Sequence, residues 1–342
     1  SNPRPRVAES LSFSVQQMNL FMFKQIDEKF SGFINLEIIN SLSTEDQWGG
    51  FALDEAWVKY DRGQHLKVKA GLLVPTFNNL NTIRDRTPLL PYIMRPFAYE
   101  TLVSDFLSTD ELAPRQAAIE VYGTLGMANQ IKFDYAAYVG NNTAYMIQEA
   151  IATLPSGSDS TLAKLFGGRI GIRKGPLKLG ISVSHDYADL SRIPIFTTDF
   201  SGVGTLPRSR LGFDLSLTFP GFYVESEFIR VYYSLSAEKR ARLEEIVETN
   251  FLFNEDLNKL FGYVTVGADI GESFFAYGMF SFVEDRSNIV TEDGFGMYSI
   301  GGGYRANDFL VFKVQLVYTS TFTQDLFYGK ETDVLVGLSV FL

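Results

Sequence analysis

The chain has 342 residues with a formal net charge of −10 and no cysteine, a length that allows two soluble domains or one large β structure. The acidic balance argues against a general nucleic-acid-binding protein, which needs a basic face, and the lack of cysteine excludes disulfides and thiolate metal sites. No apolar run approaches the roughly 18 residues of a membrane helix, and the start of the chain lacks the pattern of a signal peptide, so we expect the mature form if the protein is exported.

In chain order, a polar arm over residues 1–10 precedes a long series of segments in which every second residue is apolar. Residues 52–60 and 66–74 show the pattern clearly, with the short turn Asp61–His65 between them. Successive side chains on a strand point to opposite faces, so each segment has one apolar face and one polar face. We predict fifteen such strands: Leu11–Gln25, Phe30–Ile39, Ala52–Tyr60, Leu66–Val74, Arg115–Leu125, Ile131–Val139, Phe166–Arg173, Leu177–Ser184, Arg208–Thr218, Phe222–Tyr233, Phe261–Ile270, Phe274–Val283, Phe295–Tyr304, Phe309–Tyr318 and Thr332–Phe341.

The connections between these strands alternate between short and long. Short turns such as Lys174–Pro176 contain glycine, whereas a long connection holds Ser236–Val247, which has a helical pattern. Aromatic residues crowd the short turns. This sorting is typical of outer-membrane barrels, with short periplasmic turns, longer extracellular loops and aromatic girdles. We therefore predict an all-β chain that forms a single transmembrane antiparallel β-barrel over residues 1–342. In lipid an all-β chain must close into a barrel, because an open sheet would leave the backbone groups of its edge strands unpaired.

The strand Glu55–Tyr60, followed by Leu66–Gly71 and Val74–Phe77, resembles the outer-membrane porins of the phosphate-selective porin O and P family. In that family an acidic-Ala-aromatic strand precedes a strand end with Lys, Gly and Pro-Phe, and then a large loop. The opening segment Phe13–Phe23 also resembles the start of the family. The resemblance covers roughly the first hundred residues. It implies a pore of 16 strands, often trimeric, with the loop after Pro75 folded inward.

Few residues suggest enzyme chemistry. His65 lies in a predicted short turn. His185 lies on the same face of its strand as the apolar residues, near the strand end, so we interpret the two histidines as turn and rim residues. Glu225 and Glu227 lie at i and i+2 on a polar strand face, which indicates a solvated row rather than glycosidase carboxylates or a calcium site. We expect no catalytic residue, no cofactor and no metal. A barrel enzyme that depends on His185 or His65 is an alternative.

The segment 76–114 is far longer than a hairpin needs, and loops of this length are usually functional. We predict that it folds into the lumen and narrows the pore. The charged residues expected at this constriction are Arg84, Asp85, Arg86 and Arg95. An external loop is the alternative reading, because loops lie on the surface by default.

The polar faces of the strands predict the lining of the pore. Its basic residues are Lys59, Lys67, Lys69, Lys132, Arg169, Arg173, Lys178, Arg208, Arg210 and Lys313, and its acidic residues are Glu37, Glu55, Asp134, Asp186, Asp214, Glu225, Glu227 and Asp333. The lining has a slight basic excess, whereas the negative charge of the chain lies mainly in the long loops, where salt screens it beyond roughly 8 Å. Rings of basic side chains favour anions, so we expect a weak anion preference.

The predicted function is passive diffusion of small hydrophilic solutes or ions across the outer membrane of a Gram-negative bacterium. The expected partners are outer-membrane lipid and lipopolysaccharide, the solutes or anions, and further copies of the chain in a homotrimer, with no role for nucleic acid. A structural or plugged barrel that anchors a partner complex is the alternative, because fifteen strands are counted where 16 are implied.

Overall fold

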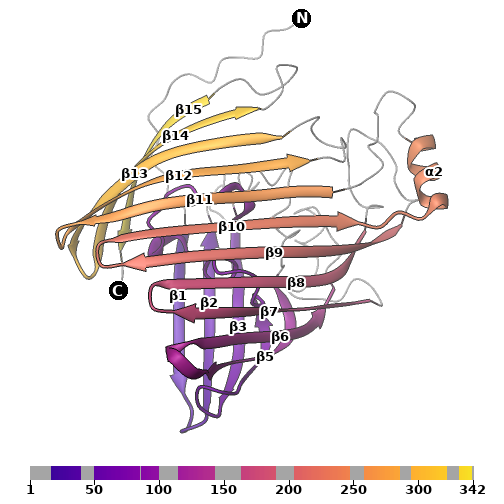
Figure 1. The fold of residues 1–342 in the computed structure, drawn as a ribbon, viewed down its shortest axis with the longest axis horizontal. Helices are drawn as coiled ribbons and strands as arrows, with labels where there is room; N and C mark the ends of the chain where they lie inside the picture. The colour runs from indigo at the N-terminus through magenta and orange to yellow at the C-terminus, as the bar shows by residue number, and fades with distance from the viewer. Residues whose placement is uncertain are drawn as a thin grey trace, which may run out of the picture.

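A computed structural model describes residues 17–39, 50–84, 86–99, 115–142, 163–189, 204–246, 258–285, 294–321 and 331–340. In these residues fifteen strands form one antiparallel sheet, and each strand pairs with the next in the sequence (Figure 1). The strands are β1 Gln17–Gln25, β2 Phe30–Ile39, β3 Gly50–Asp61, β4 Lys67–Leu73, β5 Gln116–Gly126, β6 Lys132–Asn141, β7 Lys164–Lys174, β8 Leu177–Asp189, β9 Thr205–Phe219, β10 Phe222–Tyr233, β11 Asn258–Ile270, β12 Phe274–Asp285, β13 Phe295–Asn307, β14 Leu310–Thr321 and β15 Glu331–Val340.

Every predicted strand is confirmed, with ends that shift by a few residues, although residues 11–16 of the first one and Phe341 of the last one lie outside the described residues. Helical structure in the described ranges is limited to short pieces. These are η1 Asn81–Ile83, η2 Thr87–Leu89, η3 Phe97–Tyr99, η5 Ala128–Gln130 and α2 Ala237–Ile246, the last of which confirms the predicted loop helix. No helix in the described ranges has the length and hydropathy needed to cross a membrane.

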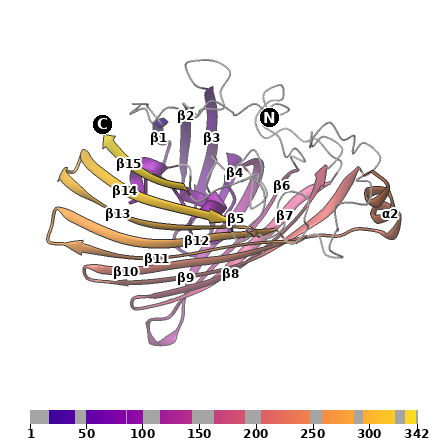
Figure 2. The same ribbon diagram turned by 90° about the horizontal axis from the view of Figure 1, so that it is seen from above.

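The sheet curves round on itself, so that β1–β3 lie opposite β9–β12 (Figure 2). Short turns join the strands of each hairpin at one end of the sheet, and the residue that lets the chain reverse is often glycine. Gly175, Gly221 and Gly271 occupy such turns with φ of 56°, 75° and 68°, a region in which a side chain is unfavourable. The chain thus has the all-β, porin-type barrel architecture that the alternating connections predicted.

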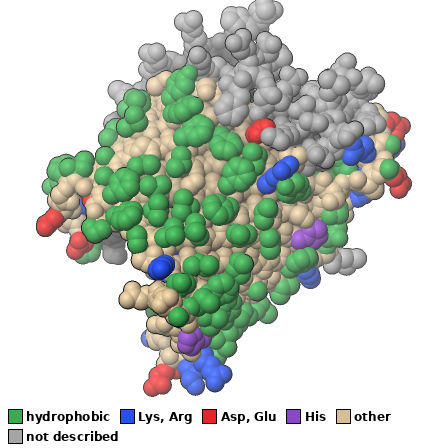
Figure 3. All heavy atoms as spheres, in the orientation of Figure 1, with side chains coloured by type: hydrophobic (Ala, Val, Ile, Leu, Met, Phe, Trp, Pro, Cys, Tyr) green, Lys and Arg blue, Asp and Glu red, His purple; other side chains and the backbone are tan. Residues whose placement is uncertain are grey.

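Burial alternates along the strands and separates an inner face from an outer face. In β7, for example, Arg169 is buried on the inner face, whereas its neighbour Ile170 is exposed on the outer face. Figure 3 shows hydrophobic side chains spread over the outer surface, with most of the charged side chains near its ends. Aromatic pairs lie beside the short turns, such as Phe274 and Tyr304 with ring centroids 4.9 Å apart. An apolar band bordered by aromatic residues matches the lipid-facing surface of a membrane barrel.

The inner face is not polar all round, which differs from the prediction. On β10–β14 it is lined by apolar side chains, and these pack against apolar residues of the segment that follows β4. The strand members of this cluster are Ile229, Val231, Phe261, Tyr263, Phe275, Tyr277, Met279, Val283, Phe295, Met297 and Val317, and the members from the segment are Phe77, Leu80, Leu90, Tyr92, Phe97, Ala98 and Tyr99. The strands in this region are apolar on both faces because one face meets lipid and the other meets the segment.

Candidate pore and inner loop

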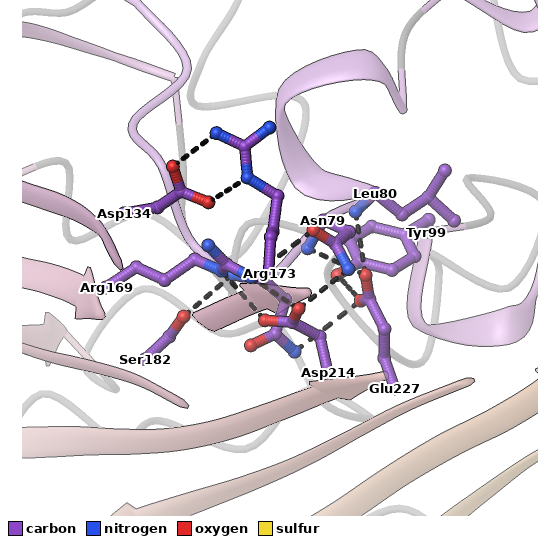
Figure 4. Close-up of polar contacts among 10 residues, drawn as sticks. Asn79, Leu80, Tyr99, Asp134, Arg169, Arg173, Ser182, Asp214 and Glu227 are labelled. Atoms are coloured by element: carbon purple, nitrogen blue, oxygen red, sulfur yellow. Dashed lines mark hydrogen bonds and ion pairs between the residues drawn. The ribbon is translucent and has the colours of Figure 1, made fainter. Parts of the chain in front are cut away.

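Residues 75–99, which we call the inner loop, leave the end of β4 and cross to the inner face of β8–β10. There the carboxylate of Glu227 accepts hydrogen bonds from the backbone N–H groups of Asn79 and Leu80, at 2.9 and 2.7 Å, and from the hydroxyl of Tyr99 at 2.5 Å (Figure 4). Glu227 is almost fully buried, so these bonds replace the water that the carboxylate gives up. One side chain therefore holds both ends of the inner loop.

The middle of the inner loop contains the predicted constriction residues. Arg84 and Arg95 are buried, and their described bonds include one from Arg84 to the side chain of Asn81 and one from Arg95 to the carbonyl of Arg84. Arg86 is partly exposed and reaches the opposite wall, where it forms an ion pair of 3.1 Å with Glu55. Asp85 lies outside the described residues. Arg86 is thus the member of this group that combines solvent exposure with a position against the strand wall.

Arg86 also covers aromatic rings on the inner face of β1–β3. Its guanidinium carbon lies 5.5 Å from the ring centroid of Phe33 and 5.9 Å from that of Phe21. Phe33 in turn stacks on Trp57 with centroids 5.0 Å apart. Such cation–π contacts, together with the ion pair, fix the guanidinium against this wall.

The last part of the inner loop is bound to β11, β12 and β14. Gln315 accepts hydrogen bonds from the backbone N–H groups of Ile93 and Met94, both at 2.8 Å, and donates one to the carbonyl of Met94. Lys313 donates to two loop carbonyls, and Ser281 accepts from the backbone N–H of Phe97. The inner loop therefore contacts strands on several sides of the enclosed space. The remainder of the predicted segment, residues 100–114, lies outside the described residues.

The inner face of β4–β9 is charged, in contrast to the apolar face of β10–β14. Its buried arginines are paired with carboxylates on the next strand or on the strand after that. Arg169 donates to both oxygens of Asp214 at 2.8 and 2.6 Å, and Arg208 donates to both oxygens of Asp186 at 2.8 and 2.7 Å. Arg210 also bonds to Asp186 at 3.0 Å. Two-pronged bonds of this kind fix both the position and the orientation of the guanidinium groups.

Cations outnumber carboxylates on this wall. The inner-face positions of β4–β9 hold eight cations, Lys67, Lys69, Lys132, Arg169, Arg173, Lys178, Arg208 and Arg210, and four carboxylates, Glu120, Asp134, Asp186 and Asp214. Lys132, Arg173 and Lys178 stand directly opposite one another on β6, β7 and β8. Arg173 is bound to Asp134, whereas the ammonium groups of Lys132 and Lys178 form no hydrogen bond or ion pair with another described residue. The wall thus has an excess of four positive charges.

The pairing of the strands places all eighteen predicted lining residues at inner-face positions, and ten of them show the range of exposures. Lys132 is exposed, Arg169, Arg208, Arg210 and Glu227 are buried, and Lys67, Lys69, Arg173, Lys178 and Glu225 are intermediate. A cavity of about 390 Å³ opens between the start of the inner loop and this wall. Lys67, Lys132, Arg169, Arg173 and Asp134 are the charged residues that line it.

Two buried carboxylates of the inner face, one on β5 and one on β3, were missed from the sequence. Glu120 is fully buried and forms an ion pair of 3.0 Å with Lys69, and Asp54 is buried where a register shift in β3 turns it inward. The alternation of β5 puts Glu120 on the polar face, so that signal was available. The register shift that reorients Asp54 leaves no such signal in the sequence.

The two histidines lie away from the inner face. The Nδ1 atom of His185 is 2.9 Å from the hydroxyl of Ser209, and the ring packs against Phe166 on the outer side of the sheet. The neighbouring Asp186 points inward to Arg208, so this carboxylate is not oriented towards the histidine. His65 lies in the short turn between β3 and β4. Both positions agree with the rim and turn interpretation.

No protein-family model matches the sequence, and a search among well-characterised proteins found no match. Solved structures do share the fold. The anion-selective porin from Comamonas acidovorans superposes with a TM-score of 0.60 at 12% identity, covering 94% of this chain and 88% of that one. OmpF of Salmonella typhi in complex with daunomycin gives 0.56 at 9% identity, with coverages of 95% and 89%. The outer-membrane channel DcaP of Acinetobacter baumannii gives 0.54 at 11% identity, with coverages of 94% and 83%. These similarities establish a porin-type barrel fold, and they do not single out the phosphate-selective porins.

Proposed function

We propose that the protein is an outer-membrane porin through which small hydrophilic solutes and ions diffuse passively, with a weak preference for anions. The observation that carries this proposal is the charged inner wall, where eight cations face four carboxylates on β4–β9. The low-dielectric wall of a narrow path strengthens the field that fixed charges exert on a passing ion. An excess of fixed cations therefore raises the local concentration of anions.

The inner loop is the proposed constriction. It is bound to β10 through Glu227, to β3 through Arg86 and to β14 through Gln315, so it crosses the space that the sheet encloses. Its apolar side chains cover the inner face of β10–β14. The open path is therefore expected along the charged wall rather than along the axis of the barrel, with Arg86 at its border.

Recording of single channels in planar lipid bilayers tests this proposal. Steady ohmic conductance is expected, and a salt gradient should give a reversal potential of the sign that indicates anion preference. The preference should increase as the salt concentration falls, because screening weakens. Clear cation selectivity at low salt contradicts the proposed ion preference.

A plugged or structural barrel is the second candidate. It is favoured by the packing of the inner loop, whose apolar residues form one buried cluster with β10–β14. The same recording separates the two candidates, because a plugged barrel that anchors a partner shows no steady conductance in a correctly folded sample.

The proposed location is the outer membrane of a Gram-negative bacterium, with lipid and lipopolysaccharide around the barrel. A homotrimer is proposed by analogy with OmpT of Vibrio cholerae, which was solved in a trimer form and superposes with a TM-score of 0.53 at 11% identity. Cross-linking in detergent micelles tests this assembly.

A further inference from the structure

The cavity beside the charged wall has an unusual combination of size and charge. It measures about 390 Å³, and its lining includes Lys67, Lys132, Arg169 and Arg173 against the single carboxylate of Asp134. Small-molecule sites in proteins have volumes of roughly 300–1,000 Å³. The cavity is therefore in the range of a ligand site rather than of a packing defect.

Three of its four cations already have a carboxylate partner, and the ammonium group of Lys67 lies 3.4 Å from the carboxylate of Asp61. Arg173 donates to both oxygens of Asp134 at 2.5 and 2.6 Å, and Arg169 donates to both oxygens of Asp214. Lys132 stands directly opposite Arg173 in the pairing of β6 with β7, and it forms no ion pair with any described residue. Lys132 is therefore the cation of this cavity that has no carboxylate partner among the described residues, and an anion bound beside it would supply that partner.

The size of the cavity limits the kind of anion that fits. Its volume equals that of roughly thirteen liquid water molecules of ~30 Å³ each, far more than one inorganic oxyanion occupies. The uncharged part of the lining contains Tyr122, Ala136 and Gly123, together with the polar residues Gln64, Thr76, Thr124 and Tyr135. An uncharged, flat part of a ligand can rest on this surface while its anionic group meets Lys132 and Arg173.

We propose that this cavity is a binding site for small organic anions that combine a flat ring with one phosphate or carboxylate group, and that bare inorganic anions bind it more weakly. The proposal rests on the proposed function, because the site lies on the proposed path of the anions, at the end of the barrel where the short turns are. Lys132 supplies the charge that holds the anionic group, and the surface around Tyr122 supplies the selectivity for a ring.

Calorimetric titration of the full-length protein in detergent micelles at low ionic strength tests the site, with adenosine 5′-monophosphate, inorganic phosphate and adenosine as probes. The monophosphate should bind at least tenfold more tightly than phosphate, and adenosine should show no binding. Lys132→Gln should weaken binding of the monophosphate about tenfold, as expected for the loss of one charge-assisted hydrogen bond. Lys174→Gln is the matched control, because it removes the same charge from the neighbouring strand on the outer face, and its affinity should equal that of the unchanged protein.

Other outcomes overturn the proposal. Equal affinity for phosphate and the monophosphate would show a site for bare oxyanions, and equal affinity for adenosine would show a site for the ring alone. Equal loss in Lys132→Gln and Lys174→Gln would place the binding elsewhere. Calorimetry does not require ion flow, so binding without conductance in bilayers contradicts the proposed pore and leaves the site, whereas conductance without binding contradicts the site and leaves the pore.

Discussion

The two halves of the inner surface are stabilised in different ways. The wall formed by β4–β9 is charged, and its buried arginines are stabilised by two-pronged pairs such as Arg169 with Asp214. The wall formed by β10–β14 is apolar and is covered by the inner loop. Hydrophobic burial holds the loop to one side, and the few polar anchors fix its exact course. The difference teaches that apolar burial positions most of the inner loop on β10–β14, so the proposed path for solutes lies along the charged wall.

Deletion of Asn79–Arg95 should have the largest effect on the difference between the two walls. It removes the loop from the apolar wall and should raise single-channel conductance severalfold, because the proposed constriction disappears. Retained folding is checked by heat-modifiable migration on gels. Unchanged conductance in a folded barrel excludes a constricting role for these residues.

Glu227→Ala removes the one side chain that holds both ends of the inner loop. It leaves the N–H groups of Asn79 and Leu80 without their acceptor in a buried place, so we expect a loss of about 3 kcal/mol in the free energy of unfolding. Unfolding by urea in detergent micelles measures it. Glu225→Ala is the matched control on the same face of β10. Glu225 accepts no hydrogen bond from a described residue, so the control should change stability by about 0.5 kcal/mol or less.

Neutralisation of Lys132 and Lys178, whose ammonium groups have no partner among the described residues, tests whether the charged wall sets the ion preference. The double variant Lys132→Gln, Lys178→Gln removes half of its excess charge, so the reversal potential should move towards the unselective value, more at low salt than at high salt. The control Lys24→Gln, Lys174→Gln changes two exposed cations on the outer face and should leave the reversal potential unchanged. An equal shift in both variants assigns the effect to net charge rather than to the inner wall.

Tyr99→Phe is the mildest test of the loop anchor. Burial raises the pKa of Tyr99 well above its ordinary value, and the nearby carboxylate of Glu227 raises it further, so the hydroxyl stays protonated and donates to Glu227. Its removal should cost about 1 kcal/mol in stability and leave conductance unchanged, because the ring keeps its packing against Tyr263. A stability loss as large as that of Glu227→Ala contradicts the assignment of most of the anchor to the two backbone N–H groups.

The sequence predicted the charged wall well and the apolar wall poorly, for one physical reason. On β7 and β9 polar and apolar residues alternate, so the parity of Arg169 or Arg210 identifies the inner face directly. On β11 both parities are apolar, as with Phe261 and Val264, and alternation then carries no information about which face meets lipid. The information lies instead in a distant segment, since the inner side is apolar only because the inner loop covers it.

The same limit applies to the predicted constriction. Three arginines within one loop predict a charged rim, but their partners decide which of them faces solvent. Arg84 and Arg95 are buried and donate to Asn81 and to the carbonyl of Arg84 within the inner loop, whereas Arg86 extends to Glu55 on β3. Nothing in the local sequence distinguishes these three positions.

The anchoring of the inner loop also implies an order of assembly. Gln315 bonds to Ile93 and Met94 across 222 and 221 residues of chain, and Lys313 reaches Pro88 across 225. Contacts between such distant residues form slowly, because most of the chain must be in place before they become possible. The bonds from Gln315 and Lys313 to the inner loop can therefore form only after β14 has joined the sheet. A chain that ends before Leu310 would contain the whole charged wall but would lack the hydrogen bonds between β14 and the inner loop.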